Sequence, residues 1–164
     1  MDTSTFQQLT LEKIRLCTQQ LDTWPEFLQG VACNISTSSR TVDANSYFQT
    51  FIEMFSNFRV GTICMLSESE FLKQDFTQFM LCDEEYRHLK HIGWILDTNM
   101  LMLDLEKEEV FVYDRHTHKI EFMGSFCFLI FNVMFGPQYI PWASKSKDDW
   151  YTLLEDAGLV GKIT

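Results

Sequence analysis

The feature that most constrains the fold of this chain is a change in the spacing of its apolar residues near position 90. Upstream, apolar residues recur at three- and four-residue intervals, as on one face of an α-helix. Downstream, short apolar runs alternate with turn residues, and such short connections join antiparallel neighbours because parallel strands need a longer crossover. The pattern therefore predicts an antiparallel meander of four strands, at 92–96, 100–105, 110–113 and 119–123.

Most of the remaining segments are predicted to be helical. Ser4 with Gln7 and Ser67 with Glu70 have the spacing of a capping box, in which two residues satisfy each other's backbone N–H groups. The segments expected to be helical are 5–21, 24–32, 45–58, a stretch from 68 with helical character continuing toward 89, 125–135 and 146–157. A strand is predicted at 60–66, and a loop is predicted over the small polar residues 34–40.

Length and composition limit the architecture further. The chain has 164 residues, which fits one domain at roughly 150 residues per domain. Hydrophobic residues make up 46% and charged residues 22%, which is ordinary for a globular protein and excludes a disordered chain. Helices followed by a meander and further helices predict an α+β fold: a single domain over 1–164 with an antiparallel β-meander packed against several helices.

The charge of the chain is strongly negative and unevenly distributed. Thirteen Lys and Arg against 23 Asp and Glu give a formal net charge of −10, and residues 83–114 contain nine acidic and three basic residues. A negative surface repels nucleic-acid phosphates and anionic membranes, so we expect neither as a partner. It attracts basic proteins instead. The alternative is a solvated face that only keeps the protein soluble.

The cysteines and the apolar stretches indicate the compartment. The five cysteines are odd in number and include no Cys-x-x-Cys, so neither a disulfide framework nor a zinc site is predicted. Their mostly apolar neighbours favour buried free thiols in a reducing compartment. The N-terminal residues do not resemble a signal peptide, and the apolar stretch 126–135 is half of the roughly 20 residues needed to cross a bilayer. We therefore expect a cytoplasmic protein.

Few residues suggest catalytic chemistry. His116 and His118 form a His-x-His pair that could bind a metal together with Asp114. This segment is a predicted turn, however, and the other two histidines are distant in sequence. A cysteine–histidine signature and a glycine loop for phosphates or dinucleotides are both lacking. We expect no enzyme, no cofactor and no bound metal; a metal-dependent hydrolase that uses His116 and His118 is the alternative.

The acidic meander also contains aromatic residues, and this combination is typical of protein interfaces. The alternative is that alternate residues fill the core while their acidic neighbours face water. The residues predicted to bind a partner are Trp94, Asp97, Asp104, Glu106, Glu108, Glu109 and Asp114.

These segments resemble the SUKH superfamily over about residues 59–136. Residues 59–63 and 67–71 are similar to a strand and the "sentry" helix of that family, and 92–105 to two strands of which the second ends in Leu-Asp-Leu. Residues 110–114, Val-Phe-Val-Tyr-Asp, are similar to the following strand, and Ser125-Phe126 with Phe131 to the closing helix. The Asn-Gly-Gly of the family is missing, and the helices within 1–58 and the tail beyond Pro141 are less typical.

The resemblance implies a non-catalytic function. Many bacterial SUKH proteins look like immunity proteins that bind and neutralise toxins, often nucleases, and herpesviral and fungal members look like interaction modules. A nuclease is basic because it binds nucleic acid, so an acidic protein would complement it and associate with it faster. We expect an immunity protein that occludes the active site of a basic toxin domain, possessing no catalytic residues. The alternative is an interaction module of viral or host-directed type.

Overall fold

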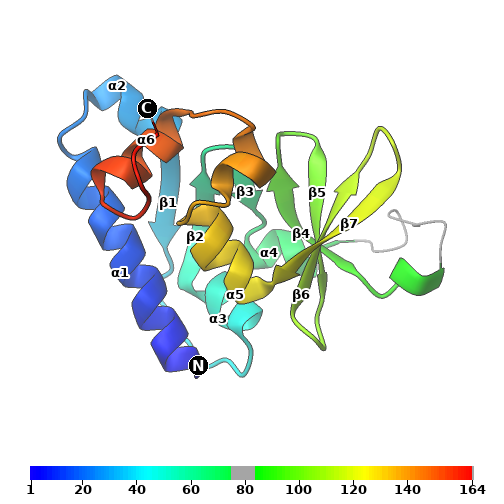
Figure 1. Cartoon of the computed structure of the whole chain (residues 1–164). Helices are drawn as coiled ribbons and strands as arrows, with labels where there is room; N and C mark the ends of the chain where they lie inside the picture. Colours follow the sequence, from blue (N-terminus) through cyan, green and yellow to red (C-terminus); the bar gives the residue numbers. More distant parts are fainter. Residues whose placement is uncertain (75–83, 164) are drawn as a thin grey trace.

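The computed structural model describes residues 1–74 and 84–163, and its strands form one antiparallel sheet in chain order. Figure 1 shows the strands following one another from β1 to β7, with the last strands strongly twisted. The meander predicted from the sequence supplies the last four. The strands are β1 (Cys33–Thr37), β2 (Phe55–Val60), β3 (Ile63–Met65), β4 (Lys90–Ile95), β5 (Asn99–Asp104), β6 (Glu109–Asp114) and β7 (Lys119–Ser125).

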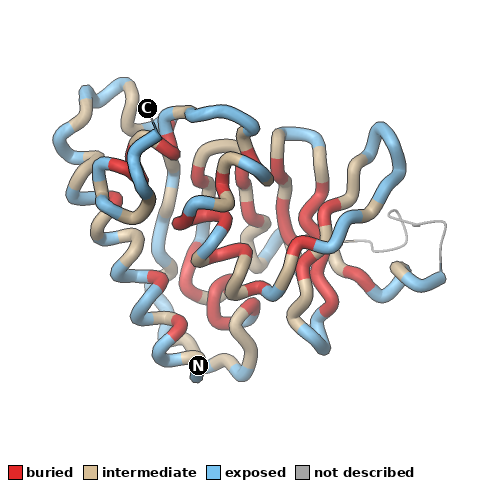
Figure 2. Tube along the Cα trace, viewed as in Figure 1, coloured by how far each residue is buried: buried red, intermediate tan, exposed pale blue. Residues whose placement is uncertain are grey.

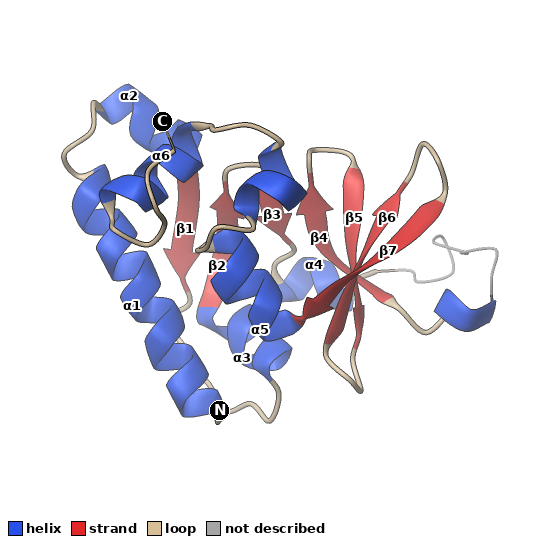
Figure 3. Cartoon of the chain, viewed as in Figure 1, coloured by secondary structure: helices blue, strands red, loops and turns tan. Residues whose placement is uncertain are grey.

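Helices precede, interrupt and follow the sheet (Figure 3). They are α1 (Thr3–Leu21), α2 (Glu26–Ala32), α3 (Tyr47–Met54), α4 (Glu68–Leu72), the 3₁₀ turn η2 (Glu84–Tyr86), α5 (Phe126–Phe128) with its π-helical continuation η3 (Leu129–Met134), η4 (Ile140–Ser144) and α6 (Asp149–Asp156). This arrangement confirms the predicted α+β fold with an antiparallel meander and several helices.

The main core lies between one face of the sheet and the helices, and aromatic rings dominate it. The ring of Phe51 lies 4.7 Å from that of Phe58 and 5.7 Å from that of Phe126, so it joins α3, β2 and α5. Trp150 of α6 is fully buried, and its Nε1–H donates to the carbonyl of Met134 at 2.7 Å. Figure 2 shows the buried residues concentrated in the strands and in the helices beside them. Edge-to-face ring contacts of this kind add to the stabilisation from burial.

The strand β5 is buried on both of its faces. Leu101 and Leu103 point into the main core, whereas Met100 and Met102 point to the opposite face and belong to a second cluster with Leu89. Trp94, Tyr86, Phe111 and Tyr113 pack against that second cluster. Because both faces are covered, β5 has a continuous apolar run rather than an alternating pattern.

The loop predicted at 34–40 is wrong, because residues 33–37 form the strand β1. This strand pairs with β2, placing Asn34 opposite Arg59 and Ser36 opposite Asn57. β1 is an edge strand without a fully buried side chain: only Cys33 and Ile35 pack against the core, and the strand is held mainly by backbone pairing with β2. A prediction based on apolar periodicity misses a strand of this kind.

Two predicted boundaries between 45 and 66 are also wrong. The helix α3 ends at Met54, and the next six residues form β2. Phe58 and Val60 alternate as in a strand, whereas Phe55 and Phe58 have the three-residue spacing that favoured a helix. The strand expected over 60–66 is divided by a tight turn at Gly61 and Thr62. Gly61 has φ of +52°, and a Cβ there would collide with the hydroxyl of Tyr139, so a side chain is excluded at this turn.

The helix ends confirm some of the predicted caps and correct others. Ser67 and Glu70 form the predicted capping box of α4. Asp2, and not Ser4, caps α1, because its side chain accepts from the N–H of Thr5 at 2.7 Å. The helix predicted from 68 ends at Leu72; its expected continuation toward 89 includes residues 75–83, which lie outside the described residues.

Candidate protein-binding site

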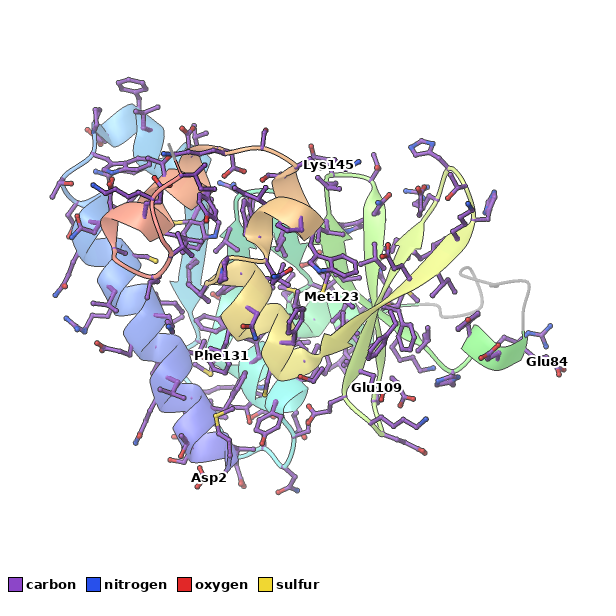
Figure 4. The ribbon with its side chains drawn as sticks, viewed as in Figure 1. Asp2, Glu84, Glu109, Met123, Phe131 and Lys145 are labelled. Carbon is purple, nitrogen blue, oxygen red and sulfur yellow. The ribbon has the colours of Figure 1, made fainter. Side chains whose placement is uncertain are left out.

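The residues predicted to bind a partner lie at two opposite ends of the meander. Residues 99–104 of β5 separate these ends by about 17 Å, at roughly 3.3 Å per residue. In Figure 4, Glu109 marks one end and Lys145 lies at the other. The Glu106 end, defined as the β5–β6 turn 105–108 with its flanking strand residues, contains Asp104, Glu106, Glu108 and Glu109. The Asp97 end, defined as the turns 96–98 and 115–118 with their flanking strand residues, contains Trp94, Asp97 and Asp114.

At the Glu106 end, Asp104 organises the turn. It is 7% exposed, and its Oδ1 accepts from the backbone N–H of Glu106 at 2.9 Å and of Lys107 at 3.1 Å. Nε2 of His88 lies 3.2 Å from its Oδ2. Burial alone would raise the pKa of Asp104, but these hydrogen bonds outweigh burial and lower it. Its carboxylate is therefore occupied within the chain.

Glu108 connects the same turn to the helices. Its Oε1 accepts from the backbone N–H of Phe48 at 2.8 Å, in the first turn of α3. Its own carbonyl accepts from the N–H of Phe126 at 2.7 Å, at the start of α5. Glu108 has φ of +52°, which the tight turn requires. A carboxylate at a helix N-terminus satisfies a free N–H and interacts favourably with the helix dipole.

The other two acids at this end are more available. Glu106 is exposed in the turn, and Glu109 is half-buried at the start of β6, opposite Asp104 and Ser125. Of the four acids predicted here, Glu106 thus has the side chain best placed to meet a partner.

At the Asp97 end, Asp114 organises the β6–β7 turn. Its Oδ1 accepts from the N–H groups of His116 at 2.8 Å and Thr117 at 3.2 Å, and these hydrogen bonds lower the pKa of the carboxyl. Asp97 is exposed in the β4–β5 turn with φ of +61°, a conformation that aspartate tolerates.

Trp94 lies at the Asp97 end on the outer face of the sheet, away from the Glu106 end. It is half-buried in β4, opposite Cys64 and Met100. The guanidinium carbon of Arg115 lies 5.6 Å from its ring centroid, and the ring of His91 packs edge-on at 4.6 Å. Trp94 is therefore part of an aromatic and methionine face, separate from the acids at 104–109.

The predicted His-x-His pair lies in the exposed β6–β7 turn. Nδ1 of His118 lies 2.7 Å from the hydroxyl of Tyr113, and the N–H of His116 donates to Asp114 as described. Within residues 1–74 and 84–163, no three His, Cys, Asp or Glu side chains are grouped so that they could hold a metal ion.

The cysteines that the structure describes are free thiols. Cys17 is buried, whereas Cys33, Cys64 and Cys127 are half-buried; Cys82 lies outside the described residues. Burial raises the pKa of Cys17 to about 12 and that of Cys127 to about 11, because it disfavours the thiolate. Both thiols are protonated at neutral pH.

Sequence reasoning missed an apolar groove beside the Glu106 end. It has a volume of about 330 Å³ and is lined by residues of α3, α4 and the β5–β6 turn. Phe48 and Phe71 stack edge-to-face at 5.0 Å in its wall, together with Ile52. Leu72 and Leu105 line it and are 70% and 44% exposed. Two leucines this exposed at one groove form an apolar contact surface.

Carboxylates complete the groove. Glu53 of α3 and Glu68 of α4 line it, and none of its described lining residues is a Lys, Arg or His. Glu53 accepts from the side-chain amide of Gln49 at 3.0 Å and from the N–H of Asp43 at 3.2 Å, which fixes its position. Leu105 belongs to the same turn as Glu106, so the groove and the exposed acid of that end are adjacent. The sequence contains a signal for this arrangement: Leu105 is an apolar residue directly before three charged turn residues, 106–108.

The cavity at the Asp97 end has a different character. Its volume is similar, about 320 Å³, and its lining includes Val112 of β6 and Trp142 of η4. Two acids, Asp114 and Glu121, are matched there by two bases, Lys119 and Lys145. The lining of this cavity therefore has no net charge, whereas the two carboxylates of the groove outnumber the one cation paired with them, Arg40.

No helix among the described residues combines the length and the apolar character needed to cross a membrane.

Comparison of the chain with protein-family models, with curated proteins and with solved structures gives no match. The resemblance to the SUKH superfamily therefore stays a prediction.

Proposed function

We propose that this chain is a non-catalytic binding protein that neutralises a basic protein partner by covering the partner's active site. The observation that carries the proposal is the groove at the Glu106 end, where the exposed Leu72 and Leu105 lie beside the carboxylates of Glu53 and Glu68. Apolar side chains surrounded by charge are the usual composition of a protein interface.

The partner class follows from charge and from the SUKH resemblance. A net charge of −10 speeds association with a basic protein and opposes association with nucleic acid. The resemblance implies a toxin domain, and a nuclease would have the required basic surface. The proposed function is accordingly that of an immunity protein, located in the cytoplasm with the toxin that it neutralises.

The groove is preferred to the Asp97 end for two reasons. The charges in the cavity at the Asp97 end balance, so this cavity gives a basic partner no electrostatic advantage. Trp94, the aromatic residue predicted to bind a partner there, is covered on one side by Arg115.

The experiment is a pull-down from the native host with tagged protein, washed at low and at high salt, with bound proteins identified by mass spectrometry. We expect to recover one basic polypeptide that high salt releases. The purified chain should inhibit the nuclease activity of that polypeptide. Recovery of a specific partner without toxic activity would replace the immunity function by that of an interaction module. Recovery of no specific protein would contradict the proposal.

A variant pair then tests the groove itself. Leu72→Gln with Leu105→Gln should weaken binding of the recovered partner about tenfold, because central apolar contacts dominate interface energies. Phe27→Gln is the matched control, since Phe27 is 77% exposed on α2, away from the groove. Substitution of such exposed side chains should leave the melting temperature nearly unchanged. Equal binding by both variants would place the interface elsewhere.

A further inference from the structure

One arginine of the chain interacts with both carboxylates of the groove. Arg40 lies in the segment 38–46 between β1 and α3, and its Nη2 contacts Oε2 of Glu68 and lies 3.8 Å from Oε1 of Glu53. The two carboxylates belong to different helices, α3 and α4, and converge on one cation. A guanidinium is the group best matched to paired carboxylates, because its N–H donors are fixed in a plane.

The Arg40 contact has the properties of an exchangeable ion pair. The side chain of Arg40 is 46% exposed, whereas those of Glu53 and Glu68 are 12% and 34% exposed. Exposed ion pairs contribute little to stability, since water solvates both partners and the long side chain loses freedom. The carboxylates are thus the better-fixed half of the pair, and an incoming guanidinium that compensates the mostly buried Glu53 can take the place of Arg40.

We propose that Arg40 occupies the position that an arginine of the partner takes, so that binding exchanges the internal guanidinium for an external one. This inference rests on the proposed function, and it specifies the partner's chemistry. The partner presents an arginine next to an apolar side chain, with the arginine between Glu53 and Glu68 and the apolar group against Leu72 and Leu105. Arg40 keeps the carboxylates paired in the free protein and competes with the partner for them.

The test compares two variants that change the net charge equally. Arg40→Gln removes the competing cation, whereas Arg15→Gln removes an exposed arginine of α1 that pairs with Glu12 at 2.6 Å. The probe is the blocked peptide acetyl-Leu-Arg-Leu-Arg-Leu-amide, titrated into ¹⁵N-labelled protein and followed by the amide signals of Leu72 and Leu105. A second peptide, with citrulline in place of arginine, keeps the shape and removes the charge.

Arg40→Gln should bind the arginine peptide about two- to fivefold more tightly than Arg15→Gln, the fold-change that corresponds to loss of one exposed ion pair. The citrulline peptide should show no such preference. If both variants bind the arginine peptide equally at the groove, Arg40 does not compete and this inference is overturned, while the groove remains a binding site. If neither variant shows shifts at Leu72 and Leu105, the groove itself fails as the binding site, and the inference with it.

Discussion

The two ends of the meander are built from the same strands and are both rich in acids, yet they use those acids differently. At the Asp97 end, one acid organises a turn and the nearby cavity has as many bases as acids. At the Glu106 end, Asp104 and Glu108 are occupied within the chain, and the acids of α3 and α4 lie beside exposed leucines. Counting acids along the sequence therefore overestimates the charge that a partner can meet, because turns and helix ends use part of it.

Two aspartates, one at each end, show that the role of a carboxylate depends on its position. Asp104 and Asp114 occupy equivalent places, each the last residue of a strand with its Oδ1 on two N–H groups of the following turn. Asp104 is 7% exposed and also lies 3.2 Å from Nε2 of His88, whereas Asp114 is half-buried before an exposed turn. The same local motif thus uses a buried carboxylate at one end of the meander and a half-buried one at the other.

The largest predicted effect is a loss of folding stability at low pH. It is caused by a buried histidine, unlike the exposed histidines at the Asp97 end. His91 is buried, its Nε2 lies 2.7 Å from the carbonyl of Gly93, and burial lowers its pKa to about 4. Between about pH 6.5 and pH 4 the unfolded chain binds a proton that the folded protein does not, so stability falls as the pH falls. The loss is at most about 3 kcal/mol, from roughly 1.4 kcal/mol per pKa unit.

Urea unfolding from pH 7 to pH 4 measures this loss. His91→Gln should flatten the decrease in the free energy of unfolding over that range, with His116→Gln at the exposed turn as the matched control. An unchanged pH profile for His91→Gln would show that His91 is not the group responsible.

The second prediction tests whether the two ends differ in their attachment to the core. Glu108→Ala removes the carboxylate that accepts from the N-terminus of α3, and should reduce the free energy of unfolding by about 2 kcal/mol. Asp114→Ala removes a carboxylate of an exposed turn and should reduce the free energy of unfolding by less than Glu108→Ala does. Urea denaturation of both variants measures the two losses of unfolding free energy. Equal losses would mean that the two ends do not differ in their attachment to the core.

The smallest predicted effect is a change in affinity for the partner. Glu106→Gln and Asp97→Asn each neutralise one exposed turn acid, and asparagine tolerates the positive φ of position 97. Glu106→Gln should weaken partner binding by about twofold at low salt and reduce its salt dependence, because a charge at the rim of an interface acts mainly on association. Asp97→Asn should leave both unchanged. Equal effects would mean that the net charge of the chain, and not the Glu106 end, attracts the partner.

The meander could be predicted from the sequence because its signal is local. In β6 and in the apolar run of β5, turn residues bound each strand closely, and the apolar residues fix the faces. The capping box at Ser67 and Glu70 is local in the same sense. The strand β1 could not be predicted, since Asn34 and Ser36 are held by hydrogen bonds to β2, whose residues lie more than 20 positions away.

The candidate site shows the same division. The sequence identified an acidic stretch that contains Glu106 and Leu105, and so indicated the turn. It could not indicate that Phe48 of α3 and Glu68 of α4 line one groove with that turn, nor that Arg40 pairs with two of the acids. These contacts join residues that are 13 to 57 positions apart in the chain.

The sequence by itself determined the α+β architecture, the meander and the excess of negative charge, because apolar spacing, turn residues and charge are properties of short segments. Only the tertiary structure decided which acids remain available to a partner and which apolar side chains accompany them. The physical reason is that a carboxylate's role depends on the donors around it, and folding brings those donors from distant parts of the chain: the N–H of Phe48 to Glu108, and the guanidinium of Arg40 to Glu68.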